Sequence, residues 1–164
     1  EGAATVNGGL RLADNVRAES LTTVNGSINV GDDGEVSDEV GAVNGRISLN
    51  RGTRVGEDVG NVNGQIGVAG AEVGGDVTTV NGDIELSDGG VVKGDVVVER
   101  PSNWSWGKEK SRKHRIVIGP GCRVEGTIRL EREVELFISE SAQVGGVSGE
   151  MTMDDAVRFE GDRP

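Results

Sequence analysis

Aromatic side chains are scarce in this chain of 164 residues, which has two Phe, two Trp and no Tyr. Globular cores draw much of their buried surface from aromatic residues. A globule packed around aromatics is therefore excluded. Glycine is abundant instead, with 28 residues. We expect a thin core of Val, Ile and Leu that is turned by glycines.

Cysteine and histidine are each present once, as Cys122 and His114. One cysteine cannot form an internal disulfide, and the two side chains are too few for a Cys/His zinc site. The sequence predicts no cofactor.

Positive charge and long apolar runs are also lacking. The net charge of −11 opposes binding to phosphate backbones, so no nucleic-acid partner is predicted. No apolar run approaches the roughly 18 residues of a membrane span. The sequence opens at Glu1 within a repeat, and we expect a cleaved targeting segment before it. The periplasm or cell envelope is the expected compartment, with the cytoplasm as the alternative.

The most regular feature of the sequence is the tripeptide Val-Asn-Gly. It occurs five times, with steps of 18, 19, 19 and 18 residues between its asparagines. Such a period indicates stacked structural repeats. The asparagines are Asn7, Asn25, Asn44, Asn63 and Asn81.

Each repeat has the pattern of short strands. After Asn-Gly the apolar residues alternate, as in Asp83-Ile84-Glu85-Leu86, which is typical of a half-buried strand. Five apolar columns recur, and β-branched residues dominate them. We expect the Val of each Val-Asn-Gly to lie in the core. We also expect Val16 to share a core column with Val36, Val55 and Val73.

The fold class predicted from these patterns is all-β, a single-stranded parallel β-helix (solenoid) of about 18–19 residues per coil with three sides. About seven or eight coils would stack at the ordinary spacing between strands, roughly 4.8 Å. The rival is an up-and-down meander with Asn-Gly hairpins. It is disfavoured because the residues before Asn-Gly, such as Gly41-Ala42, do not alternate well. We place the solenoid at 1–149, with a basic insertion at 101–115, and a polar tail at 150–164 that could cap it.

The repeated asparagines suggest a structural ladder. Stacked carboxamides can hydrogen-bond along a solenoid as they do in cross-β structures. Asn also tolerates a left-handed backbone at a corner, where the following Gly adopts any conformation. A ligand site on this column is the alternative.

An acidic row precedes the second apolar column. Such side chains can bond turn amides or face water, and rows of oxygen atoms can also bind a cation weakly. No other metal site is predicted. The row consists of Glu39, Asp58, Asp76 and Asp95.

The segment 101–115 interrupts the repeat and carries both tryptophans. An exposed Trp-x-Trp beside a basic cluster could bind an anionic glycan, a lipid headgroup or a protein partner. The alternative is a long loop without a binding function, which the fold tolerates. The candidate binding residues are Trp104, Trp106, Lys108, Lys110, Arg112, Lys113 and Arg115.

Two phrases of the form V-x-G-D-V, at 73–77 and 92–96, accompany the Val-Asn-Gly repeats, with a looser copy at 124–128. Together they resemble two groups of bacterial β-solenoids. These are the polymer-forming bactofilins and the adhesin-like toast-rack domains of cell-envelope proteins. The resemblance implies a right-handed, three-sided β-helix, no enzyme activity and, for bactofilins, end-to-end assembly. The basic insertion and polar tail depart from the bactofilin pattern.

The sequence therefore predicts a non-catalytic structural protein of the bacterial cell envelope that self-associates. Residues that follow Asn-Gly share no chemistry, as Gly9, Arg46 and Asp83 show, and a scaffold tolerates such variety. The alternative function is an adhesin-like binding module that contacts an envelope glycan, lipid or protein through 101–115.

Overall fold

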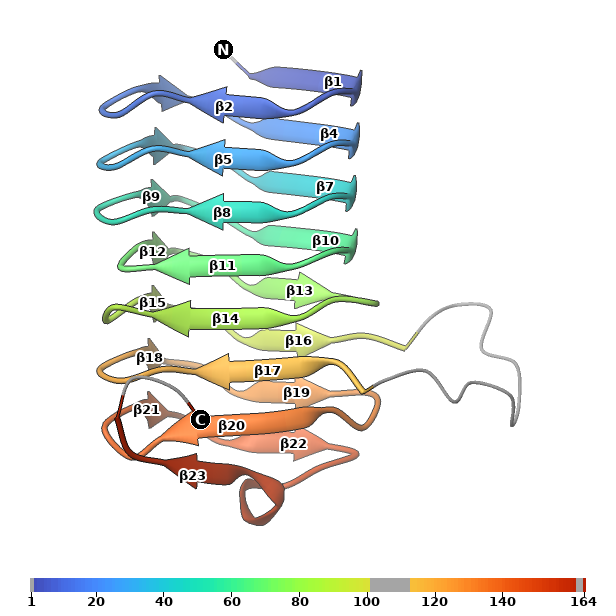
Figure 1. Cartoon of the computed structure of the whole chain (residues 1–164), viewed down its shortest axis with the longest axis vertical. Coiled ribbons are helices and arrows are strands. Elements are labelled where there is room, and N and C mark those ends of the chain that lie inside the picture. The colour runs from blue at the N-terminus through green and yellow to red at the C-terminus, as the bar shows by residue number, and fades with distance from the viewer. Residues whose placement is uncertain (1, 101–112, 162–163) are drawn as a thin grey trace.

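The computed structural model describes residues 2–100, 113–161 and 164. The chain winds in coils that stack along one axis, from the N-terminus to β23 (Figure 1). The coils form three sheets of eight, eight and seven strands, and all strand pairs of the described residues are parallel. The three-sided parallel β-solenoid is thus confirmed, and the antiparallel meander is wrong. The described residues contain no α-helix.

Sheet A contains the strands that lead into the Asn-Gly corner. Its order follows the sequence coil by coil, because every return to this face takes one full turn. The strands are β1 (Ala3–Asn7), β4 (Leu21–Asn25), β7 (Val40–Asn44), β10 (Val59–Asn63), β13 (Val77–Thr79), β16 (Val96–Val98), β19 (Ile128–Leu130) and β22 (Val147–Gly149).

Sheet B follows the Asn-Gly corner and faces the viewer in Figure 1. Its strands are β2 (Leu10–Leu12), β5 (Ile28–Val30), β8 (Ile47–Leu49), β11 (Ile66–Ala69), β14 (Ile84–Ser87), β17 (Arg115–Ile118), β20 (Glu135–Ser139) and β23 (Val157–Phe159).

Sheet C closes each coil with two-residue strands. They are β3 (Arg17–Ala18), β6 (Glu35–Val36), β9 (Arg54–Val55), β12 (Glu72–Val73), β15 (Val91–Val92), β18 (Arg123–Val124) and β21 (Gln143–Val144). A single 3₁₀ turn, η1 (Met153–Asp155), precedes β23 among the described residues.

The stacking register survives the insertion. Asn25 and Asn44, 19 residues apart, occupy equivalent places in neighbouring coils. Asp95 and Thr127 are likewise neighbours although 32 residues separate them. Val96 of β16 still pairs with Ile128 of β19. The columns that follow the insertion therefore keep the register of those before it.

The core is a stack of aliphatic side chains from all three sheets. Most core residues of β4 to β20 have almost no exposed surface, Ile28, Ile47 and Ile66 among them. Burying one such side chain contributes roughly 1.5–3 kcal/mol. Because each coil is one strand thick, its side chains pack against the coils above and below. The stack is therefore the unit of stability.

The valines of Val-Asn-Gly do not lie in the core, so that prediction is wrong. Val6, Val24, Val43 and Val62 are 63 %, 37 %, 40 % and 38 % exposed. Strand alternation explains the error. The buried strand residue Leu21 places Thr23 inside and Val24 outside. The chain then turns at Asn-Gly, and this corner resets the alternation before Ile28.

The column inside this corner holds small side chains, most of them polar. Thr23, Ala42, Asn61 and Thr79 are buried there. The Thr23 hydroxyl donates to the carbonyl oxygen of Gly8 at 3.1 Å, and the Thr79 hydroxyl donates to Asn61 Oδ1 at 2.6 Å. Small hydroxyl and amide groups thus satisfy buried polar atoms where the chain turns.

Two further details differ from the sequence prediction. Ala18, rather than Val16, pairs with Val36 in the core column of sheet C, and Val16 is 39 % exposed. The ladder asparagines are not left-handed. Among the described residues other than glycine, positive φ occurs instead at the corner between sheets B and C, at Asn15, Asp33 and Asp88. A β-turn at this corner needs the left-handed residue, which Asn and Asp tolerate.

The last described residues extend the stack. The segment 150–161, which sequence analysis treats as a tail, contains η1 and β23. β23 pairs with the final part of β20, through Phe137↔Val157 and Ser139↔Phe159. Sheet B thereby gains its eighth strand at the C-terminal end of the solenoid.

Candidate functional site

The asparagine column forms a continuous hydrogen-bonded ladder along one corner. The Nδ2 of Asn25, Asn44 and Asn63 each donates to Oδ1 of the asparagine in the preceding coil. The distances are 3.1 Å from Asn25 to Asn7, 3.0 Å from Asn44 to Asn25, and 2.8 Å from Asn63 to Asn44. The carboxamides are exposed, but they hydrogen-bond one another between adjacent coils. This geometry favours a structural role over a ligand site.

The glycines of the last four Val-Asn-Gly tripeptides are required by close approach of the backbone. A Cβ atom on Gly45 would collide with the carbonyl oxygen of Gly26, and one on Gly64 would collide with that of Gly45. The amide of Gly26 donates to the carbonyl oxygen of Asn44 at 3.0 Å. Backbones of adjacent coils therefore meet at this corner with no room for a side chain.

The last ladder bond among the described residues joins Asn63 to Asn44, although Val-Asn-Gly occurs once more at 80–82. Asn63 and Asn81 form an isolated parallel bridge. A guanidinium nitrogen of the buried Arg132 donates to Asn81 Oδ1 at 2.9 Å and to the carbonyl oxygen of Val80 at 3.1 Å. Sequence analysis missed Arg132, because nothing in the sequence links it to a residue 51 positions earlier.

Three carboxylates of the acidic row bind backbone amides of the next coil. Oδ1 of Asp58 accepts from the amide of Asp76 at 2.8 Å, and Oδ1 of Asp76 accepts from that of Asp95 at 2.7 Å. Oδ1 of Asp95 accepts from the amide of Thr127 at 2.8 Å. Glu39, at the start of the row, is exposed. Within the described ranges no three His, Cys, Asp or Glu side chains are close enough to hold a metal ion.

This contact explains the Gly-Asp phrase in sequence terms. A Cβ atom on Gly94 would collide with Oδ1 of Asp76, and one on Gly126 would collide with Oδ1 of Asp95. The glycine of one coil thus leaves room for the aspartate of the preceding coil. The aspartate then bonds the amide of the residue that follows that glycine. The repeated phrase was visible in the sequence, but its stacking partner was not.

Most candidate binding residues of the insertion lie outside the described residues, namely Trp104, Trp106, Lys108, Lys110 and Arg112. Two are described. Lys113 Nζ lies 3.2 Å from an oxygen of Glu133. The Arg115 guanidinium lies 4.7 Å from the centroid of the Phe137 ring, a cation–π distance.

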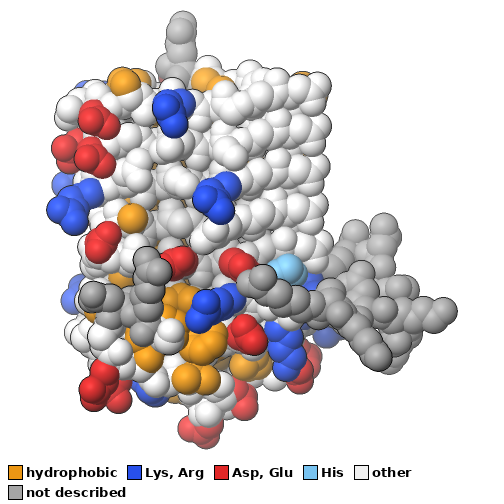
Figure 2. Space-filling view, in the orientation of Figure 1, with side chains coloured by type: hydrophobic (Ala, Val, Ile, Leu, Met, Phe, Trp, Pro, Cys, Tyr) orange, Lys and Arg blue, Asp and Glu red, His pale blue; other side chains and the backbone are white. Residues whose placement is uncertain are grey.

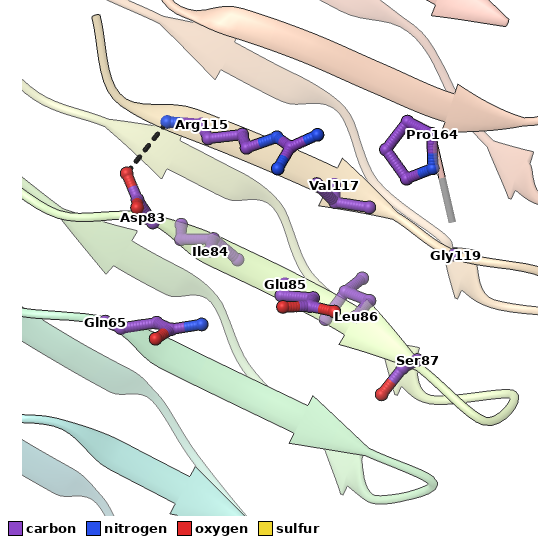
Figure 3. Close-up of a pocket in the computed structure, with 10 residues that line it drawn as sticks. All are labelled: Gln65, Asp83, Ile84, Glu85, Leu86, Ser87, Arg115, Val117, Gly119 and Pro164. Atoms are coloured by element: carbon purple, nitrogen blue, oxygen red, sulfur yellow. Dashed lines mark hydrogen bonds between the residues drawn. The ribbon is translucent and has the colours of Figure 1, made fainter. Parts of the chain in front are cut away.

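Arg115 also lines a shallow pocket of about 270 Å³ on sheet B, together with Gln65, Glu85 and Pro164 (Figure 3). Its backbone amide donates to Asp83 Oδ1 at 2.8 Å, and its buried Nε has no hydrogen-bond partner in the described structure. Such an unpaired donor is costly when buried. The pocket can therefore accept hydrogen-bonding ligands, although its two carboxylates oppose an anion.

Charges of alternating sign follow the outer face of sheet C from β3 to β12. Arg17 Nε lies 3.3 Å from a Glu35 oxygen, and Lys93 Nζ lies 2.8 Å from a Glu72 oxygen. Arg54 stands between Glu35 and Glu72 in register. The hydrogen bond from Lys93 lowers the pKa of Glu72, and the same bond raises the pKa of Lys93. These ion pairs are exposed, and each joins two adjacent coils of the solenoid.

The thiol of Cys122 is buried in the core beside the corner between sheets B and C. Burial raises the pKa of the thiol. A thiol held neutral is a poor nucleophile. Cys122 therefore packs as a small apolar side chain.

Comparison with known proteins adds no relative. No protein-family model, curated protein or solved structure matches the chain. Within the part of the chain that the structure describes, no helix combines the length and apolar character needed to cross a membrane.

Proposed function

We propose that this protein is a non-catalytic structural solenoid that serves as a scaffold or spacer in the bacterial cell envelope. The observation that carries the proposal is how the polar side chains are used. The asparagine ladder and three aspartates of the acidic row bond the next coil. A repeated ligand-binding face would instead repeat its outward chemistry. Here the residues after Asn-Gly differ from coil to coil, as Ser27, Arg46 and Gln65 do.

The envelope location and self-association rest on the resemblance of the V-x-G-D-V and Val-Asn-Gly phrases to bactofilins and adhesin-like toast-rack domains. The Gly-Asp contact supports the comparison, because it gives each phrase a role in stacking coils. The coils outside the insertion are acidic, and their outward positions vary from coil to coil. Both features suit a soluble spacer that tolerates substitution.

Two measurements test this proposal. Sedimentation velocity over a wide concentration range should show reversible association, and a strict monomer at every concentration removes the self-associating version. Fractionation of cells that express the tagged full-length protein should recover it with the envelope. Recovery in the cytoplasmic fraction would contradict the proposed location.

A second candidate function is an adhesin-like module that binds through 101–115. Arg115 favours it, because this side chain combines a ring contact with an unpaired buried donor at the edge of that segment. Trp104→Ala combined with Trp106→Ala should abolish binding to an anionic glycan array or to vesicles that contain anionic lipid. Binding that is absent in the parent protein, or unchanged in the double variant, removes this candidate.

A further inference from the structure

Three Asn-Gly pairs combine an exposed carboxamide with a neighbouring coil on both sides, at Asn25, Asn44 and Asn63. Their corner forms the right-hand edge of the upper coils in Figure 2, and no charged side chain is seen over it there. An asparagine carboxamide is most readily attacked by the following backbone amide when the next residue is Gly, which has no side chain to obstruct the approach. Each pair is thus a candidate site of chemical modification.

The ladder restrains this reaction at Asn25 and Asn44. Nδ2 of Asn44 donates to Asn25 at 3.0 Å, and Oδ1 of Asn44 accepts from Asn63 at 2.8 Å. The amide nitrogens of Gly26 and Gly45, which would be the attacking atoms, donate to carbonyl oxygens of the next coil at 3.0 Å and 2.9 Å. Attack requires the carboxamide and the amide to leave these bonds together.

The stack is looser above Asn63. β10 has four residue pairs with β7 but only two with β13, which ends at Thr79. The amide of Gly64 reaches the carbonyl oxygen of Asn81 at 3.4 Å, beyond the usual range of such bonds. No ladder bond joins Asn63 to Asn81 among the described residues, and Oδ1 of Asn81 accepts from Arg132 instead. Both reacting groups are therefore held less firmly here than in the preceding coils.

We propose that the Asn63-Gly64 pair is a site of spontaneous deamidation, and that the ladder protects Asn25 and Asn44 from the same reaction. Hydroxide from the solvent removes the proton of the Gly64 amide, and the nitrogen attacks Cγ of Asn63. The new N–Cγ bond forms, the bond from Cγ to Nδ2 breaks, and ammonia leaves with a proton from water. Water then opens the succinimide ring at either carbonyl carbon and gives aspartate or isoaspartate. The net reaction converts a carboxamide and water into a carboxylate and ammonium.

The Asn81-Gly82 pair is protected in a different way. Gly82 is buried, so hydroxide has little access to its amide. A guanidinium nitrogen of Arg132 also donates to Oδ1 of Asn81 at 2.9 Å, which fixes the carboxamide. We therefore expect Asn81 to react more slowly than Asn63.

Deamidation of Asn63 would open the ladder below it. A carboxylate has no hydrogen to donate, so Oδ1 of Asn44 would lose its bond and face another acceptor. Isoaspartate also adds a carbon to the main chain, which displaces the corner that receives the Gly45 amide. Asn44 would then be held as loosely as Asn63 is now. The reaction should thus advance along the column from one coil to the preceding one.

Peptide mapping of the full chain by tandem mass spectrometry, after incubation at mildly alkaline pH, tests the proposal. The readout is the rate at which each asparagine gains the mass difference between a carboxamide and a carboxylate. In the folded protein Asn63 should react about fivefold faster than Asn25 and Asn44, the ratio expected when local opening breaks one hydrogen bond fewer. In guanidinium chloride the three rates should become similar, because all three asparagines follow Val and precede Gly.

Two variants test the advance along the ladder. Asn63→Asp imitates the product and should raise the rate at Asn44 about threefold or more over the parent, because one ladder bond is lost. Gln65→Glu is the matched control, since it adds the same charge at the same corner and leaves the donor of Asn63 in place. Circular dichroism confirms that both variants are folded.

Equal rates at Asn63 and Asn44 in the folded protein would overturn the proposal. A preference for Asn63 that persists unchanged in guanidinium chloride would do the same, because it would come from local sequence alone. Faster reaction at Asn81 than at Asn63 also counts against it. The advance along the ladder is refuted when Asn63→Asp leaves the rate at Asn44 unchanged, or when Gln65→Glu raises that rate equally.

Discussion

Arg132 and Asn81 lie 51 residues apart in the sequence, yet a guanidinium nitrogen of Arg132 donates to Oδ1 of Asn81 at 2.9 Å. The same nitrogen donates to the carbonyl oxygen of Val80 at 3.1 Å. Arg132 follows β19, two coils after β13 in the order of sheet A. The bond therefore passes over the coil that the insertion interrupts, and it joins coils that are not nearest neighbours.

Replacing this arginine should destabilise the protein. Arg132→Ala leaves the acceptors of Val80 and Asn81 without their donor, which costs about 1–3 kcal/mol for partly buried groups. Arg132→Lys should recover part of the loss because it keeps one charged donor. Urea unfolding followed by circular dichroism measures both. Arg129→Ala is the control, because Arg129 is largely exposed beside Asp95. An equal loss of stability in the two alanine variants would show that the bonds from Arg132 to Val80 and Asn81 make no particular contribution.

The asparagine ladder makes its own prediction. Asn44 donates to Asn25 and accepts from Asn63, whereas Asn7 has one ladder bond. Asn44→Ala should therefore cost about 1–2 kcal/mol, from two hydrogen bonds of about 0.5–1 kcal/mol each at an exposed site. Asn7→Ala should cost about half as much. Identical midpoints of urea unfolding for the two variants would show that the ladder contributes nothing.

Replacement by Ala should affect stability differently at Gly41, within β7, and at Gly45, at the corner that follows this strand. Gly45→Ala should destabilise by about 1–3 kcal/mol or more, because its Cβ would collide with the carbonyl oxygen of Gly26. Gly41→Ala should be neutral or slightly stabilising, since its Cβ would meet its nearest atom, the carbonyl oxygen of Gly60, at 3.9 Å. Thermal unfolding of both variants provides the check. Destabilisation by Gly41→Ala equal to that by Gly45→Ala would refute the stacking explanation.

Cys122 should make stability fall at high pH. Burial raises the pKa of its thiol in the folded state. The unfolded thiol ionises near pH 8.5, so between this value and the higher folded pKa the folded state holds more protons. Stability then decreases as pH rises through that window. Urea midpoints at neutral and alkaline pH should differ more for the parent than for Cys122→Ala. Equal differences would show that Cys122 does not contribute.

The sequence was sufficient to predict the fold class, because the period of Val-Asn-Gly specifies both the coil length and the stacking. The same period indicated the ladder of Asn7, Asn25, Asn44 and Asn63. It also placed Asn81 in the ladder, whereas the Oδ1 atom of Asn81 accepts from Arg132. The valines beside them were placed wrongly, because a corner between two strands changes which side of the strand faces inward. Strand alternation read along one repeat cannot show where such a corner lies. The burial of Thr23 and Asn61 follows from that corner.

The candidate sites were less predictable. The bond from Arg132 to Asn81 depends on two coils brought together by folding, and no spacing within the sequence indicates it. The role of the Gly-Asp phrases appears only when Gly94 is placed over Asp76.

The alternating charges of sheet C have a consequence for how the chain finds its register. Consecutive coils have nearly interchangeable apolar columns, so a coil that loops out would still offer its neighbours a matching core. Skipping one coil would set Arg17 against Arg54, and Glu35 against Glu72, in place of the observed opposite charges. Like charges directly opposite each other on a sheet are destabilising. On β3, β6, β9 and β12 the outer charges therefore disfavour a stack from which one of these coils is omitted.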